Sequence, residues 1–299
     1  MKRNIIQQGK SYTLTLPKKW VESLHLKNKD EVTVEEEESK LIIQGKGRAS
    51  IKTKEISLLP EMSEKNIKLL ISNAYKKGYD SLTLRLYSPK ELSKIEKILQ
   101  DLIGFEIIDI SSDNILIKSV ALDLEEEYQH LFRKSVYLCN ENMDLILGDI
   151  KKGSYPHGDT IKEYRRMITR YTDYVKRVLN KKRNQEIAFD YLITRDVEKV
   201  SNELSYLYAY LEECTPAVDK MTRAYLEMVF TVFRNLLTNY FKQDLRYIEE
   251  FIQKKDQFIF KDFYKSLKNK HLDHTILHHA ANILRRCSDM VGPFYGKYL

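Results

Sequence analysis

The sequence predicts a multidomain protein: an N-terminal β module, a small α+β domain and a C-terminal all-α bundle of two three-helix halves. Three successive patterns in the 299 residues lead to this prediction. Short alternating segments dominate up to about residue 47. Strand-like and helix-like segments then mix, and beyond residue 122 apolar residues recur every three or four positions. We therefore expect domains at residues 1–48, 49–121 and 122–299, with the halves of the last at about 122–214 and 215–299.

The first domain is expected to contain three strands and one short helix. The strands are predicted at residues 11–17, 30–34 and 40–44, where apolar and polar residues alternate. A short amphipathic helix is predicted at residues 18–26, directly after Pro17. Gly9 is expected to serve the turn before the first strand, because glycine adopts turn conformations at little cost.

The second domain combines strands and helices in the manner of a small α+β sandwich. Strands are predicted at residues 50–59 and 81–87, and helices at residues 63–77 and 89–102. The second of these helices is expected to have Ser88 as its N-cap and Pro89 at its first position. Residues 105–110 and 115–120 are predicted to form a hairpin around the polar turn at residues 111–114.

Six helices are predicted in the third domain, at residues 123–151, 158–182, 184–213, 218–243, 245–268 and 271–291. Their apolar residues step by three and four, which is typical of the core-facing stripes of a bundle. The sequence also indicates that this domain is internally duplicated, since residues 197–202 of the third helix align with residues 284–289 of the sixth. In this register Ser201 matches Ser288. The equal placement of the two segments favours three helices in each half.

The composition indicates a cytoplasmic globular protein that is not an enzyme. The net charge is +7 and the pI is about 9.0, which favours polyanionic partners. The cysteines Cys139, Cys214 and Cys287 are far apart in the sequence, as expected of reduced thiols. No apolar run of about 18 residues exists, so we expect no membrane insertion. Nucleotide-binding and hydrolase motifs such as GxGxxG, the Walker loop and GxSxG are absent from the sequence.

A cluster of basic residues marks the start of the chain. No acidic residue occurs between Lys2 and Lys19. Such a segment can neutralise DNA phosphates, and a dimer would double the contact area. The alternative is an ordinary solvated, charged face. The five basic residues of this segment are Lys2, Arg3, Lys10, Lys18 and Lys19.

The first domain resembles the AbrB/MazE/SpoVT swapped-hairpin family. The resemblance rests on four elements that follow one another at the family spacing. Residues 8–20 contain a strand that ends in Leu-Pro and the basic start of a short helix. Residues 24–26 and 30–34 lead into the next strand, and residues 41–43 belong to the last one. It implies a dimer with interlocked strands that contacts DNA. By position, the implied DNA-binding residues are Arg3, Lys10, Lys18 and Lys19, with Lys2 and Ser11 as second choices. Family members often carry more arginine here, and lysine lacks the bidentate fork used for base readout.

The helical domain resembles PhoU, a regulator of phosphate uptake, and the whole layout resembles archaeal PhoU-type regulators. The resemblance implies a cation site on the third helix of each half. In each half, a step of two carboxylates four residues apart (Glu/Asp-x-x-x-Asp) would share one helix face and hold the cation. Here each step keeps one carboxylate, because Glu198 is followed by Asn202 and Asp289 is preceded by Arg285. A divalent metal such as iron, zinc or magnesium could use Glu198 and Asp289. The alternative is that these are helix-surface charges in a fold without metals.

A second candidate metal site lies in the last predicted helix. His274 and His278 have the i, i+4 spacing that zinc-binding helices use, and His271 precedes them on the same face. No glutamate separates the pair as in HExxH, so hydrolase chemistry is not indicated. The alternative is that these histidines are packed or solvated side chains.

These patterns favour a homodimeric DNA-binding transcription regulator, which by the PhoU resemblance acts in phosphate uptake or phosphate-linked signalling. No cofactor is required. The first alternative is a signalling adaptor that binds a phosphate transporter or sensor kinase and uses the hairpin only to dimerise. A further alternative is a metal-binding helical sensor.

Overall fold

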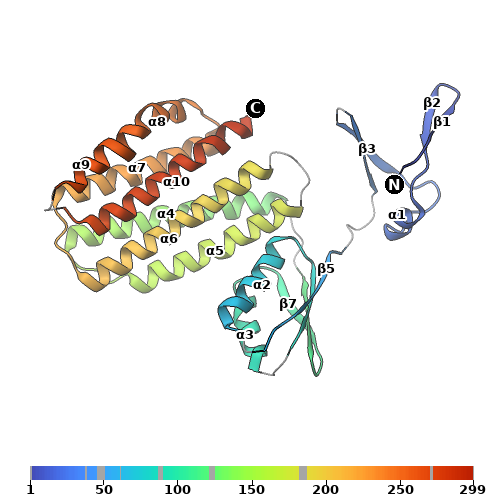
Figure 1. The fold of residues 1–299 in the computed structure, drawn as a ribbon, viewed down its shortest axis with the longest axis horizontal. Helices are drawn as coiled ribbons and strands as arrows, with labels where there is room; N and C mark the ends of the chain where they lie inside the picture. The colour runs from blue at the N-terminus through green and yellow to red at the C-terminus, as the bar shows by residue number, and fades with distance from the viewer. Residues whose placement is uncertain are drawn as a thin grey trace. The chain divides into compact units, whose positions relative to one another are not determined.

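The computed structural model describes residues 2–37, 39–45, 51–60, 62–86, 90–120, 125–181, 187–269 and 272–298 (Figure 1). The chain forms two compact units, Met1–Thr53 and Lys54–Leu299. The segments predicted as an α+β domain and a helical domain both belong to the second unit. No helix within the described ranges is long and apolar enough to cross a membrane.

The first unit consists of two antiparallel strand pairs and one short helix. Strands β1 (Ile5–Gln8) and β2 (Ser11–Leu14) pair across Gly9, whose φ of +64° confirms its expected role in the turn. Helix α1 (Lys18–Ser23) precedes the second pair, β3 (Val32–Glu37) and β4 (Lys40–Gly45). Strand β1 was not predicted, because its sequence Ile-Ile-Gln-Gln does not alternate and only its pairing with β2 makes it a strand.

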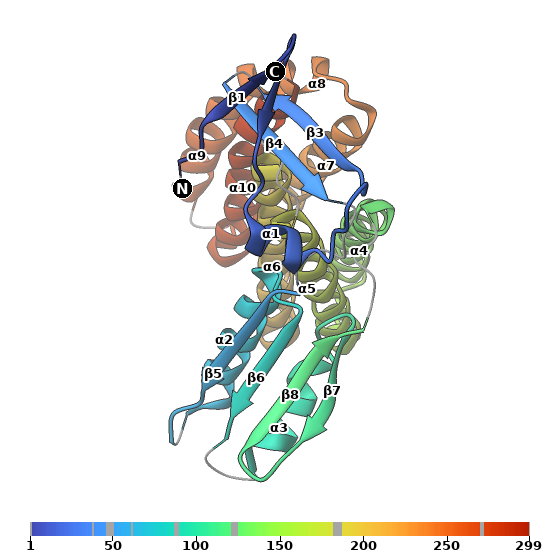
Figure 2. The same ribbon diagram turned by 90° about the vertical axis from the view of Figure 1, so that its right-hand side faces the viewer.

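The α+β part of the second unit is a four-stranded sheet in the order β5-β6-β8-β7. Helices α2 and α3 lie against one face of this sheet (Figure 2). Ser63 caps α2 as its hydroxyl accepts a hydrogen bond from the Asn66 N–H. The predicted hairpin at residues 105–120 is confirmed, whereas the predicted N-cap Ser88 lies outside the described residues. The elements are β5 (Thr53–Ser57), α2 (Glu64–Lys76), β6 (Ser81–Arg85), α3 (Lys90–Leu99), β7 (Phe105–Ile110) and β8 (Asn114–Ser119).

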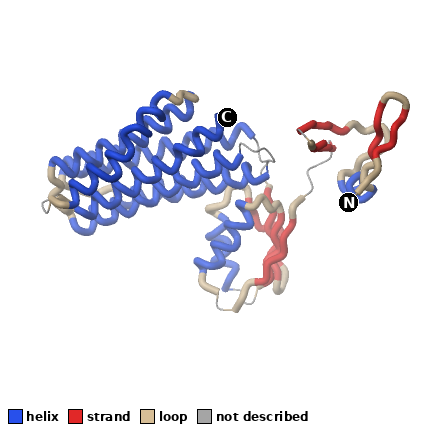
Figure 3. Tube along the Cα trace, turned by 45° about the horizontal axis from the view of Figure 1, so that its top comes forward, coloured by secondary structure: helices blue, strands red, loops and turns tan. Residues whose placement is uncertain are grey.

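The rest of the second unit is a bundle of long helices that pack side by side around an apolar core (Figure 3). The predicted stripe on the third helix is confirmed, since Ile193, Val197 and Leu204 are all fully buried. The helices are α4 (Glu125–Lys152), α5 (Gly158–Lys181), α6 (Ile187–Cys214), α7 (Lys220–Lys242), α8 (Arg246–Asp256), α9 (Phe263–Leu267) and α10 (His274–Tyr298), with the π-helix η1 (Gln257–Asp262) between α8 and α9.

Two predicted helices in the bundle are present but differ in detail from the prediction. The predicted helix at residues 245–268 is interrupted by η1, where the Tyr225 hydroxyl donates a hydrogen bond to the Phe258 carbonyl at 3.5 Å. The last helix continues beyond the predicted residue 291, through Pro293, to Tyr298. Packing favours this extension, because Phe294 is fully buried and its ring centroid lies 4.6 Å from that of Tyr240.

Candidate nucleic-acid interface and polar clusters

The first unit has apolar strands but no buried residue among its described positions. Ile5 is 69% exposed, Tyr12 71% and Leu41 59%, although all three lie on paired strands. Strand β4 does pack against the residue that follows α1, since a Cβ added at Gly45 would lie 2.9 Å from the Leu24 Cδ1 atom. A single copy of this unit therefore leaves most of its apolar surface in water, an arrangement that favours association.

All six predicted DNA-binding residues are exposed in the first unit. Lys2 and Arg3 precede β1, and Lys10 and Ser11 lie at the turn between β1 and β2. Lys18 and Lys19 open helix α1, with the Lys18 Nζ atom 3.7 Å from the Glu22 carboxylate. Cations in the first turn oppose the helix dipole, so these two lysines do not stabilise the helix that carries them. Both side chains are exposed, so an anionic partner can reach them, although Lys18 also lies near Glu22.

The loop after α1 holds two residues in the left-handed conformation that favours glycine. His25 has a φ of 54° and Lys29 a φ of 75°. A side chain at such a φ costs on the order of 1 kcal/mol. Asp30 stabilises the loop, because its carboxylate accepts a hydrogen bond from the Lys27 N–H at 2.6 Å. This local strain was not predicted, since no glycine marks the positions.

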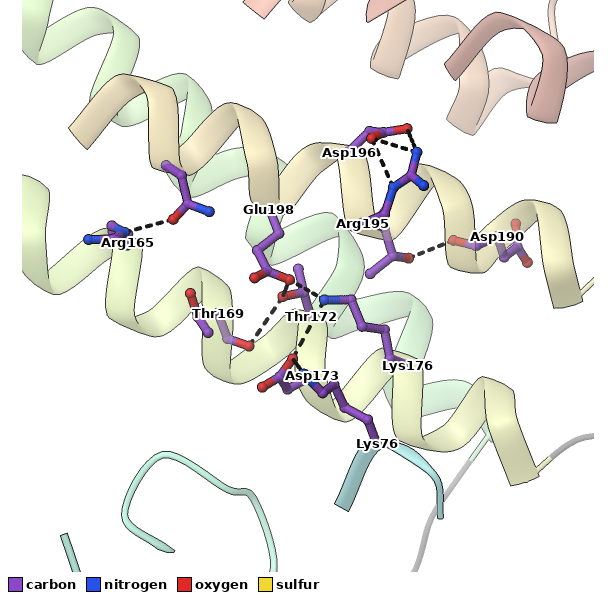
Figure 4. Close-up of polar contacts among 12 residues, drawn as sticks. Lys76, Arg165, Thr169, Thr172, Asp173, Lys176, Asp190, Arg195, Asp196 and Glu198 are labelled. Atoms are coloured by element: carbon purple, nitrogen blue, oxygen red, sulfur yellow. Dashed lines mark hydrogen bonds and ion pairs between the residues drawn. The ribbon is translucent and has the colours of Figure 1, made fainter. Parts of the chain in front are cut away.

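Glu198, a predicted metal ligand, lies in an ionic cluster between α5 and α6 (Figure 4). The nearly buried Lys176 ammonium donates to the Glu198 carboxylate and lies 3.5 Å from Asp173 Oδ1. The Lys76 Nζ atom is 3.8 Å from the same Asp173 oxygen. Burial raises the pKa of Asp173. Burial alone would lower the pKa of Lys176, but the charges of Glu198 and Asp173 outweigh this effect and raise the pKa of Lys176. The ammonium group of Lys176 therefore supplies the positive charge beside Glu198.

Asp289, the other carboxylate of the predicted cation pair, has a partner on its own helix. The Arg286 Nη1 atom donates to its carboxylate at 3.0 Å. Arg285 instead lies over the ring of Phe263, 5.9 Å from the centroid. Asn202 accepts a hydrogen bond from the Arg165 Nε–H at 2.7 Å. Each member of the two broken steps thus has a contact within the protein.

Each described histidine of α10 contacts a different protein group. The His274 ring contacts the Asn269 carbonyl at 3.2 Å, and the His278 ring contacts the Asn282 amide at 3.1 Å. His271 lies outside the described residues. In the described part of the chain, no group of three or more His, Cys, Asp or Glu side chains is arranged to hold a metal ion. The metal sites therefore stay predictions.

Two polar networks were not foreseen because their members come from different helices. The His279 ring lies 2.9 Å from the Glu203 carboxylate; burial would raise the pKa of Glu203, but His279 and Asn282 lower it. Elsewhere Asp149 accepts a hydrogen bond from the Tyr208 hydroxyl at 2.6 Å. Burial and this carboxylate raise the pKa of Tyr208 above its ordinary value. Sequence spacing carries no signal for contacts between helices.

Comparison with known proteins bears on the first unit. Residues 5–50 match the family model described as "Antidote-toxin recognition MazE, bacterial antitoxin". No curated protein and no solved structure matches the chain. The N-terminal segment is therefore a MazE-type domain, as its resemblance implied, while the resemblance of the helical part to PhoU has no support from these comparisons.

Proposed function

We propose that the chain is a DNA-binding regulator whose N-terminal unit works as a homodimer. The observation that carries this proposal is the combination, in one MazE-type domain, of unburied apolar strands with a basic first half. The apolar strands favour a second copy as the partner, because one copy cannot form a core of its own. The basic residues at the strand starts and at α1 favour an anionic ligand.

The chemistry of the basic residues favours phosphate contacts over base readout. Five basic side chains precede residue 20, and four of them are lysines. A lysine ammonium is a point charge that contacts phosphate oxygens, whereas bidentate recognition of guanine is an arginine property. The proposed complex is thus salt-sensitive, and DNA shape contributes to its specificity.

The proposed role of the helical part is to sense a signal. By its resemblance to PhoU the signal is phosphate status, received through a ligand or a partner protein. A change in the helical part would alter the spacing of the two hairpins and so their fit to DNA. Equal DNA affinity with and without every candidate effector would contradict this coupling.

The exposed apolar strands account for dimerisation by themselves, and they favour a second candidate function, an adaptor with an antitoxin-like dimerising module. In that case the hairpin serves only dimerisation, and the helical part binds a phosphate transporter or sensor kinase. The two functions differ in one measurable property, the affinity of the intact dimer for duplex DNA.

Fluorescence anisotropy with labelled promoter duplexes, at two salt concentrations, tests the proposal on the full chain. We expect binding that weakens as salt rises. The Lys18→Glu/Lys19→Glu variant should lose binding without loss of circular dichroism signal. Lys151→Glu/Lys152→Glu is the matched control, because it changes the charge equally at an exposed pair on α4. A dimer that binds no duplex at either salt concentration contradicts DNA binding and leaves the adaptor.

A further inference from the structure

The interface of α4 and α6 contains two matching strips of fully buried residues. Both strips step by three and four positions, so each faces one side of its helix. All ten residues are at most 1% exposed. The strip on α4 is Ser135, Cys139, Asn142, Ile146 and Asp149. The strip on α6 is Thr194, Val197, Ser201, Leu204 and Tyr208.

Two contacts fix the register between these strips. The Cys139 Sγ atom lies 4.0 Å from the Val197 carbonyl oxygen, and the Tyr208 hydroxyl donates to Asp149 at 2.6 Å. The residue numbers differ by about the same amount in both pairs, so the helices run parallel with equal rise. This register places the members of the two strips in five successive layers, with Asn142 and Ser201 at the level of the middle layer.

The five layers alternate between polar and apolar. Cys139 with Val197 and Ile146 with Leu204 are the apolar layers. At one end, Ser135 and Thr194 donate to the carbonyls of Leu131 and Asp190 of their own helices. At the other end, the Tyr208 hydroxyl and the His157 ring both contact Asp149, at 2.6 and 2.8 Å. Both end layers are thus satisfied by protein groups.

The middle layer differs from both ends. Neither the Nδ2 nor the Oδ1 atom of Asn142 has a hydrogen-bond partner within the described residues, and the same holds for the Ser201 hydroxyl. Buried polar groups almost always have partners, from the protein or from ordered water. Asn140 Oδ1 is also buried without a partner in the described residues, but two unsatisfied side chains at the same level of two packed helices point to a ligand between them.

We propose that Asn142 and Ser201 hold an internal water molecule that bridges α4 and α6. The Asn142 oxygen needs a donor, its Nδ2 group needs an acceptor, and the Ser201 hydroxyl needs a partner of its own. A water molecule has two donors and two acceptors, so it pairs with the Asn142 amide and with the Ser201 hydroxyl at once. Asn142 and Ser201 are at most 1% exposed and have apolar layers on either side, so the site is closed to bulk solvent. The bridge fixes the α4–α6 register as buried polar layers do in other helix pairs.

A high-resolution crystal structure of the full chain tests the proposal directly. We expect a density peak within hydrogen-bond distance of both Asn142 and Ser201, and its loss in the Asn142→Leu variant. A direct Asn142–Ser201 hydrogen bond without a water peak, or a dry layer with both groups unpaired, would overturn the proposal.

A double-mutant cycle in denaturant adds an independent readout. If the water bridges the two side chains, Ser201→Ala lowers the unfolding midpoint in the natural sequence and has little effect once Asn142→Leu has removed the other end. Ser135→Ala is the matched control, because its hydroxyl is satisfied by its own helix and lies two layers away. Its effect should add to that of Asn142→Leu. Fully additive effects of Ser201→Ala and Asn142→Leu would overturn the bridge.

Discussion

Arg177 on α5 is the largest of the fully buried side chains in the described structure, and its guanidinium joins the bundle to the sheet part. It donates to the Tyr79 carbonyl at 2.6 Å, to the Tyr75 carbonyl at 3.2 Å and to Asp80 Oδ1 at 2.8 Å. Tyr75 lies in the last turn of α2, where its carbonyl also accepts a hydrogen bond from the Gly78 N–H at 2.9 Å, and Tyr79 follows the helix. Arg177 thus acts as a cap that adds donors from another helix at the C-terminal end of α2.

We predict that Arg177→Met destabilises the second unit by about 2–4 kcal/mol, because two carbonyls lose a charged donor and each such loss costs about 1–2 kcal/mol. The Tyr75 and Tyr79 carbonyls would each lose the guanidinium as a donor, while Asp80 keeps the Lys181 ammonium at 2.5 Å. Methionine retains much of the apolar volume, so the loss reports mainly on the hydrogen bonds. For a unit of this size the melting temperature should fall by on the order of 10 °C.

Urea unfolding followed by far-ultraviolet circular dichroism measures this loss, because helices dominate the second unit. Arg166→Met is the matched control on the same helix: its ion pair with Asp101 is short, at 2.7 Å, but the Arg166 side chain is 51% exposed. Exposed pairs contribute about 0–1 kcal/mol. Equal stability losses for the two variants, or a loss below about 1 kcal/mol for Arg177→Met, would refute the capping role.

Three further predictions concern strain and pH. His25→Gly should stabilise the first unit by about 1 kcal/mol, because glycine adopts the left-handed φ of 54° without strain. The chain's only tryptophan lies in this unit, so its fluorescence reports the unfolding of the unit. An unchanged unfolding midpoint would argue against strain. Gly78→Ala should destabilise the second unit by about 1–2 kcal/mol. The backbone φ at this position is +79°, and the new Cβ would lie 2.6 Å from the Lys181 Cγ atom. A calorimetric melting temperature at or above that of the natural sequence would contradict this prediction. Glu203 has a pKa lowered by His279, so its stabilising effect is present above the ordinary glutamate range and is lost as pH falls through the folded-state value. Glu203→Gln should therefore flatten the decline of stability below about pH 4.5 in acid unfolding curves, and an unaltered pH profile would count against the pair.

Local chemistry made several elements of the fold predictable. The helix predicted at residues 63–77 lies close to the observed α2. Gly9 marked the turn between β1 and β2, and the polar turn at residues 111–114 marked the hairpin of β7 and β8. The basic character of the first half of the N-terminal unit was also visible, because charge is a property of the residues themselves. Whether these cations contact DNA stays a proposal until binding is measured.

The partners of the charged side chains could not be predicted from spacing. Glu198 was predicted as a metal ligand, and the structure places the Lys176 ammonium beside it. The histidines of α10 share a helix face in the sequence, yet each contacts a different protein group. Long side chains take their partners from whichever helix packs alongside.

By itself the sequence determined the three successive patterns of structure, most of the helices and strands, and the MazE-type character of residues 5–50, because periodicity, capping and turn chemistry are local. Only the tertiary structure decided where β1 pairs, where the π-helix interrupts a long helix, and which buried polar groups meet. Those outcomes depend on contacts between residues distant in the chain, and such contacts override local propensity. The unpaired layer at Asn142 and Ser201 is visible only at that level, since neither residue is unusual within its own helix.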